Sequence, residues 1–201
     1  MERKRLRLAG RVSFTSLITR RSVFGIYKSA QSFLMGTVLA TPVYHVERID
    51  GCERQKPLPK QLHAFAQMFL MRQLLADLPS SFLPLPELNV LCGEDRLVPD
   101  ITVVRQGARY DDGDLAEPAA LAVEILSPGQ TLSDLLDKAE RLLRAGTPLA
   151  WVIWPERRKA WEYSLDDLKE ASMTLGISLS SDRKLEISLA ELWNLLAKQV
   201  F

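Results

Sequence analysis

Apolar and polar side chains alternate over short stretches of the chain, and turn residues separate these stretches. Residues 44–49 alternate and then meet Asp50-Gly51, a dipeptide typical of tight β-turns, so we expect a strand that enters a hairpin. Between residues 60 and 78 no proline or glycine occurs and most positions are apolar, which predicts a buried helix. Three prolines follow within the next eight positions and are expected to end it.

The second half of the chain predicts further strands around one long helix. Short apolar runs indicate five strands, at residues 88–92, 97–104, 120–126, 149–154 and 160–164. A helix is expected over residues 131–145, because Thr131 and Asp134 have the spacing of a capping box and Gly146 is a typical helix end. Residues 189–198 predict a short amphipathic helix.

The order of these elements after the first hairpin is helix, three strands, helix, two strands. This order predicts an α/β fold in which helices flank a mixed β-sheet. The chain has 201 residues, enough for one domain or for one domain with an appendage. Its composition, 47% hydrophobic and 25% charged, is that of globular proteins and excludes disordered, collagen-like and disulfide-scaffold classes.

Charge is distributed unevenly along the chain. Residues 1–34 contain eight lysines and arginines and one acid, whereas the remainder carries 18 basic and 24 acidic side chains. We interpret 1–34 as a basic N-terminal extension without a packed structure and 35–201 as the folded domain; a basic arm for nucleic acid and a targeting peptide are the alternatives. Because the body is mildly acidic, its net charge gives no argument for nucleic-acid binding.

Cysteine usage and hydropathy restrict the class of protein further. Cys52 and Cys92 lie far apart and lack the spacing of paired metal ligands, which excludes a zinc site of the CxxC type and favours the reducing cytoplasm. No segment reaches the roughly 18 consecutive apolar residues that a membrane helix requires. We therefore expect a cytoplasmic protein with no membrane partner.

Two acidic residues stand inside apolar strand patterns. Asp100 precedes the run Ile-Thr-Val-Val, and Glu124 lies within residues 121–126. An unpaired charge in a buried strand costs several kcal/mol, so each acid requires a basic partner or a divalent ion. A structural salt bridge would explain either acid alone. Together with Lys138 on the following helix, however, the two acids have the composition of a Mg²⁺ site for phosphoryl transfer.

Five short motifs around these residues occur in order between positions 44 and 163. They are Val-Glu-Arg-Ile-Asp-Gly at 46–51, Val-Pro-Asp at 98–100, Val-Glu-Ile-Leu-Ser-Pro at 123–128, Asp134-x-x-x-Lys138, and Trp-Val-Ile at 151–153. In this order and spacing the chain resembles the Uma-two family of restriction endonucleases, a branch of the PD-(D/E)XK nuclease superfamily. The resemblance covers about 60% of the chain.

This resemblance implies a restriction-endonuclease-like core and Mg²⁺-dependent hydrolysis of DNA phosphodiester bonds, with Mn²⁺ as a substitute. Asp100 matches the family's first metal-binding aspartate, and Glu124 matches the acid of the (D/E)XK strand. The superfamily motif places a lysine two residues beyond that acid, where this chain has Leu126. Lys138 matches a lysine that the family supplies from the next helix, where it would orient the attacking water or stabilise charge on the phosphate.

Two further site candidates leave alternatives open. Glu47 resembles the family's N-terminal glutamate and is a candidate third acid, although it is equally explained as an exposed hairpin residue. His63 forms a polar stripe with Lys60 and Gln67 on the first helix, either as a site residue or as a histidine at the edge of the core. A basic rim for DNA, or simply a solvated face, would be formed by Arg141, Arg144, Arg157, Arg158 and Lys159.

Two classes of function remain for this chain. The first is a metal-dependent DNA endonuclease, which the complete set of two acids and a lysine favours. The alternative is a catalytically inactive relative that binds nucleic acid or a protein partner, which the acidic body would suit. Members of the superfamily often dimerise to cut both strands, and the sequence leaves a homodimer open.

Overall fold

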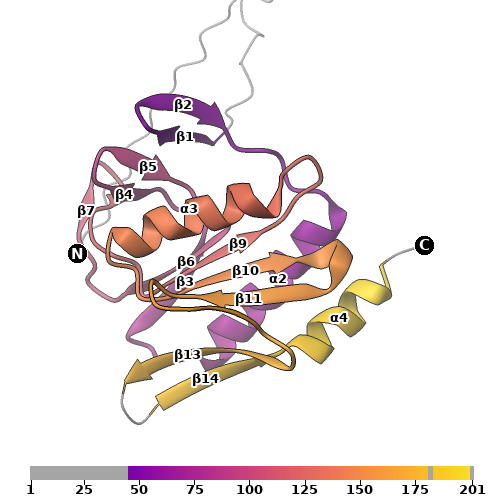
Figure 1. Ribbon diagram of the computed structural model, residues 1–201. Helices are drawn as coiled ribbons and strands as arrows, with labels where there is room; N and C mark the ends of the chain where they lie inside the picture. The colour runs from indigo at the N-terminus through magenta and orange to yellow at the C-terminus, as the bar shows by residue number, and fades with distance from the viewer. Residues whose placement is uncertain (1–44, 181–182, 200–201) are drawn as a thin grey trace, which may run out of the picture. The chain divides into compact units, whose positions relative to one another are not determined.

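The computed structural model describes residues 45–180 and 183–199 (Figure 1). The predicted extension and its boundary at residue 34 lie outside these residues. The described part opens with the predicted hairpin, in which β1 (Val46–Ile49) pairs antiparallel with β2 (Cys52–Gln55). Asp50 and Gly51 form its turn, both with positive φ, a conformation that glycine adopts readily and that aspartate tolerates in tight turns.

A mixed six-stranded sheet forms the centre of the fold, as the sequence predicted. Its strands follow the order β12-β11-β10-β9-β6-β3, and β9 and β10 are parallel while the other pairs are antiparallel. In chain order these strands are β3 (Phe82–Pro86), β6 (Ile101–Arg105), β9 (Leu121–Ile125), β10 (Ala150–Trp154), β11 (Lys159–Tyr163) and β12 (Leu168–Glu170).

The initial hairpin belongs to a second six-stranded sheet, of order β2-β1-β5-β4-β8-β7. Its other strands are β4 (Val90–Cys92), β5 (Asp95–Leu97), β7 (Tyr110–Asp111) and β8 (Asp114–Leu115). The single strand expected over 97–104 is therefore wrong, because β5 ends at Leu97 and β6 begins at Ile101. Residues 98–100 cross between the two sheets, which places Asp100 where the sheets meet.

Helices α2 (Gln61–Asp77) and α3 (Leu132–Arg144) cover opposite faces of the central sheet (Figure 1). Leu70 of α2 belongs to the core cluster that contains Val123 and Trp151. Residues of α3 belong to the cluster that contains Val152, on the other face of the same strands. Since successive side chains of a strand point to opposite faces, Glu124 lies on the face that α3 covers.

Six of the described strands were not predicted from the sequence: β3, β7, β8, β12, β13 and β14. β3 contains Pro84 and Pro86, and it lies at the edge of the central sheet, where a proline leaves no ladder partner unsatisfied. β13 (Thr174–Ser180) and β14 (Arg183–Ser188) form a separate antiparallel pair, followed by α4 (Leu189–Ala197), the predicted terminal helix. None of the described helices is long and apolar enough to cross a membrane.

Candidate active site

Asp100 and Glu124 lie at the same end of the central sheet, Asp100 immediately before β6 and Glu124 within the neighbouring strand β9. The antiparallel register pairs Ile101 with Val123, so that the residues one step further, Asp100 and Glu124, also face each other. Each is 2% exposed. The backbone N–H of Ile125 donates a hydrogen bond of 2.6 Å to Asp100 Oδ2, which fixes the carboxylate against the end of β9.

Lys138 extends from the second turn of α3 into this pair of strands. Its Nζ lies 3.0 Å from Glu124 Oε2 and 2.6 Å from Glu47 Oε1. It also donates a hydrogen bond of 2.7 Å to the carbonyl oxygen of Val98. Asp134, one turn before Lys138 on α3, accepts from the backbone N–H and the hydroxyl of Thr131 in the predicted capping box.

Glu47 is buried, so the interpretation as an exposed hairpin glutamate is wrong. Its Oε1 accepts a hydrogen bond of 2.9 Å from the backbone N–H of Val98, in addition to its contact with Lys138. The segment that crosses between the sheets thus binds both members of the Glu47–Lys138 pair. This arrangement fixes the lysine head group next to Glu124.

His63 and Lys56 contact the other side of Asp100. His63 is buried on α2, where its Nε2 lies 3.3 Å from Asp100 Oδ1 and its Nδ1 lies 2.9 Å from Ser127 Oγ. Lys56 follows β2, and its Nζ lies 2.7 Å from the same Asp100 oxygen. Within the described residues, the structure therefore brings all five predicted site residues into one cluster.

Glu87 completes this side of the cluster. Its carboxylate contacts Lys56 Nζ at 2.5 Å and accepts a hydrogen bond of 3.2 Å from Gln67 Nε2. Gln67 also donates to the backbone carbonyl of Asp100 at 2.7 Å. Of the polar stripe expected on the first helix, His63 and Gln67 thus reach the cluster, whereas Lys60 is exposed.

Burial and charge oppose each other in this cluster. Burial raises the pKa of Glu124 above its ordinary value, and the neighbouring Lys138 offsets this effect only in part. Burial also acts against ionisation of Asp100, but contacts with His63 and Lys56 outweigh it and hold the pKa of Asp100 well below its usual range. Burial alone would lower the pKa of Lys138, yet Glu124 and Glu47 raise it, so this lysine is charged.

Two buried carboxylate oxygens in this cluster make no hydrogen bond within the described residues, Asp100 Oδ1 and Glu124 Oε1. Asp100 Oδ1, however, has Lys56 and His63 beside it. Glu124 Oε1 is buried, and no polar atom of the described residues hydrogen-bonds to it. Its sister oxygen, Oε2, contacts Lys138. A buried carboxylate oxygen without a partner is costly, and a hard cation is the ligand that would remove this cost.

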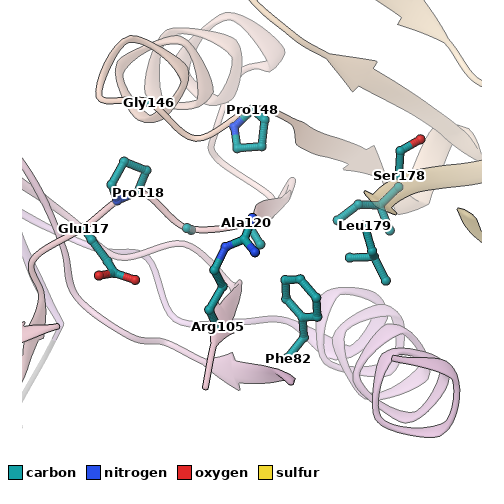
Figure 2. A pocket seen from close by; sticks show the side chains of 11 residues that line it. Phe82, Arg105, Glu117, Pro118, Ala120, Gly146, Pro148, Ser178 and Leu179 are labelled. Carbon is teal, nitrogen blue, oxygen red and sulfur yellow. The ribbon is translucent and has the colours of Figure 1, made fainter. Parts of the chain in front are cut away.

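A cavity of about 320 Å³ opens onto the Glu47–Lys138 pair. It lies between the first hairpin and the start of α3, and besides these two residues its lining includes Arg54, Gln130 and Arg141. A larger cavity of about 430 Å³ lies at the other end of the strands, beside Arg105 and Ala120 (Figure 2). Of the predicted site residues, Glu47 and Lys138 line the first cavity and none lines the second.

The predicted basic rim is largely neutralised by acids. Arg141 contacts both Asp50 and Asp95, so it connects α3 to the turns of two hairpins. Arg144 and Lys159 each contact one glutamate, Glu140 and Glu170 respectively. The guanidinium of Arg157 lies over the ring of Trp154. These contacts favour a structural role for most of the rim.

Two residues of the cluster, Lys56 and Glu87, carry no signal that the sequence analysis used. Lys56 stands between an exposed strand and Pro57, and Glu87 stands between Pro86 and an apolar residue, in a stretch expected only to end a helix. They are brought together by the pairing of distant segments. The one local signal was that each is a charged residue beside a proline, which by itself is common at the surface.

Comparison with known proteins agrees with this fold. The chain resembles the solved structure of a protein from Anabaena variabilis, described as "a putative nuclease belonging to DUF820", with a TM-score of 0.64 and 23% identity over 75% of this chain and 90% of that one. A weaker likeness, at 14% identity and a TM-score of 0.35, covers 65% of this chain and 11% of a chain in the cryo-electron microscopy structure of a DrdV–DNA complex.

A search of curated proteins finds no match to this chain. The model of the Uma2 family, the Uma-two family named above, matches residues 37–193, and its description is "Putative restriction endonuclease". This match spans most of the chain and all five clustered residues. The chain therefore belongs to the Uma2 family of restriction-endonuclease-like proteins.

Proposed function

We propose that this protein is a metal-dependent DNA endonuclease that hydrolyses phosphodiester bonds. Asp100 and Glu124 would hold Mg²⁺, and Mn²⁺ would substitute for it. The observation that supports this proposal best is the buried Glu124 Oε1, which has no hydrogen-bond partner among the described residues. The pairing of β6 with β9 brings this carboxylate next to that of Asp100.

The charge of the cluster also suits a divalent ion. With all carboxyl groups ionised, Glu47, Glu87, Asp100 and Glu124 carry four negative charges, and Lys56 and Lys138 carry two positive ones. The net charge of these side chains is therefore −2, which one divalent ion would neutralise. Carboxylate oxygens are the ligands that Mg²⁺ and Mn²⁺ prefer, and such an ion neutralises phosphate charge and lowers the pKa of a water molecule.

Lys138 is the residue we propose to act on the phosphate. Its ammonium stays charged because Glu124 and Glu47 surround it, and it faces a cavity with room for a phosphate group. A fixed positive charge at the place where negative charge develops stabilises the transition state without reorganisation. Glu47 is a positioning residue in this proposal, because it fixes Lys138 and is itself held by Val98.

DNA is the proposed substrate and the cytoplasm the proposed compartment. Arg54 lines the cavity beside Lys138 and would provide a contact to a phosphate next to the scissile bond. The cysteines Cys52 and Cys92 are both free, which supports a reducing compartment.

The test is cleavage of supercoiled plasmid at fixed ionic strength, with Mg²⁺, with Mn²⁺ and with EDTA. We expect nicked or linear product with either ion and none with EDTA. Asp100→Asn, Glu124→Gln and Lys138→Met should each lose on the order of 10²-fold or more in rate. Asp111→Asn and Glu170→Gln, which change exposed acids outside the cluster, should cleave like the wild type.

Two outcomes would contradict the proposal. Cleavage that persists in EDTA would exclude the metal-dependent reaction. A wild-type protein that binds DNA tightly but leaves plasmid, linear duplex and single strand intact with both ions would favour the alternative, a catalytically inactive binding protein.

A further inference from the structure

A second group of metal-ligating side chains meets at the Asp100 oxygen that faces Lys56 and His63. His63, Glu87 and Asp100 each offer one ligand atom there, and these three atoms lie within 4.8 Å of one another. His63 and Asp100 are buried, and Glu87 is half-buried. One nitrogen and two carboxylate oxygens form a common ligand set for divalent transition metals in proteins.

Lys56 already places a positive charge at this position. Its Nζ lies 2.7 Å from Asp100 Oδ1 and 2.5 Å from Glu87 Oε2, so it contacts two of the three groups. The side chain is buried, and the backbone N–H of Lys56 donates a hydrogen bond of 2.9 Å to the carbonyl oxygen of His45. Lys56 is therefore held at the cluster by its main chain as well as by its head group.

The three groups are held in place by neighbours that do not use up their ligand atoms. Ser127 Oγ bonds to Nδ1 of His63, and within the described residues the buried Nε2 makes no hydrogen bond, although it faces Asp100. Gln67 holds Glu87, whose backbone adopts a positive φ of 52°, a conformation uncommon for a glutamate. Ser127 and Gln67 thus orient His63 and Glu87 so that, with Asp100, one nitrogen and two oxygens face the position of a cation.

We propose that the ammonium of Lys56 takes the place of a second divalent ion in this protein. The native chain would then bind one divalent ion, at Asp100 and Glu124, and removal of the Lys56 side chain would open a second site formed by His63, Glu87 and Asp100. Because imidazole suits transition metals better than magnesium, the opened site should take Mn²⁺ in preference to Mg²⁺. This inference rests on the proposed function only because Asp100 belongs both to the proposed Asp100–Glu124 metal site and to the site that Lys56 occupies.

The experiment is a calorimetric titration with Mn²⁺ that counts the ions bound per chain. We expect one ion for the wild type, two for Lys56→Ala, and one again for Lys56→Ala/Glu87→Gln. Lys56→Arg keeps the positive charge and should bind one ion. Lys159→Ala, which removes an exposed lysine paired with Glu170, is the matched control and should also bind one.

One further variant separates this inference from the proposed function. Lys56→Ala/Glu124→Gln should keep one Mn²⁺, because the opened site does not use Glu124. If the wild type binds no ion while Lys56→Ala binds one that Glu87→Gln removes, the proposed Asp100–Glu124 site is wrong and the role of Lys56 stands. A single ion in Lys56→Ala, lost in Lys56→Ala/Glu124→Gln, would overturn the role of Lys56 and support the first site.

The wild-type protein provides a test that needs no variant to fold. Electron paramagnetic resonance of free Mn²⁺ measures how many ions the native chain binds at saturation. One bound ion agrees with a lysine in the second position. Two bound ions in the wild type would overturn the inference, because the second position would then be open with Lys56 present.

Discussion

Replacing Lys138 with methionine removes the ammonium group shared by Glu47 and Glu124 and keeps a buried stem of similar shape. In the native structure this ammonium makes three polar contacts, to the two carboxylates and to the carbonyl oxygen of Val98. Glu47 and Glu124 are both buried, so water entering through the cavity beside Glu47 replaces the lost contacts only in part. The variant therefore leaves two carboxylates without their common counterion.

The expected loss follows from what it costs to break a buried ion pair. Removing one partner of such a pair typically costs about 3–5 kcal/mol, because the other charge stays buried and unpaired. For a domain of this size, that loss corresponds to a fall of roughly 6–20 °C in melting temperature. Much of it should return in Lys138→Met/Glu47→Gln, because glutamine removes a charge and keeps an oxygen that accepts from the Val98 N–H.

Urea unfolding in EDTA, followed by circular dichroism, measures these free energies without a contribution from metal. Lys159→Met is the matched control, since it removes an exposed lysine that pairs with Glu170 at 3.0 Å, and it should cost no more than about 1 kcal/mol. A loss below about 1 kcal/mol for Lys138→Met would contradict the pairing of Lys138 with buried carboxylates, because Lys138 would then behave as an exposed lysine. The absence of any recovery in the double variant would contradict the assigned pairing with Glu47.

Two further predictions concern the ends of α3. Thr131→Ala should cost about 1 kcal/mol in urea unfolding, because the hydroxyl loses its bonds with the backbone N–H and the carboxylate of Asp134. Hydrogen bonds from Thr131 hold the pKa of Asp134 below its ordinary 3.8, so their contribution to stability is present above pH 3.8 and is lost as the pH falls through the lowered pKa. The difference in unfolding free energy between Thr131→Ala and the wild type should therefore shrink at low pH, and a difference that does not shrink would contradict the pairing. Gly146→Ala should lose more stability than Gly113→Ala. Both glycines have positive φ, but a Cβ at Gly146 would lie 2.8 Å from Pro118 Cγ whereas one at Gly113 meets nothing within 4 Å, and equal losses would show that Pro118 moves aside.

The central part of the site could be predicted because burial and acidity conflict within single strands. Asp100 and Glu124 interrupt apolar runs, and such a conflict is visible without any knowledge of the fold. Local rules are sufficient for features of this kind. Lys138, in contrast, was identified through the resemblance to the Uma-two family, and the capping box of Thr131 and Asp134 predicted only where its helix begins.

The remaining part of the site depends on segments that are distant in sequence. Lys56 meets Asp100 and Glu87 because the segment after β2 reaches the segment after β3, and no local pattern encodes that meeting. The strand β3 was missed for a related reason. Its prolines argue against a strand unless the strand lies at the edge of a sheet, and edge position is a property of the whole fold.

Anomalous scattering from crystals grown with Mn²⁺ tests the central claim most directly. We predict one strong peak that contacts both Asp100 and Glu124, including the Glu124 oxygen that lacks a hydrogen bond among the described residues. Asp100→Asn crystals prepared in the same way should lose the peak. Saturating Mn²⁺ that leaves both carboxylates without a peak, or a peak that persists unchanged in Asp100→Asn, would contradict the assignment of these two acids as metal ligands.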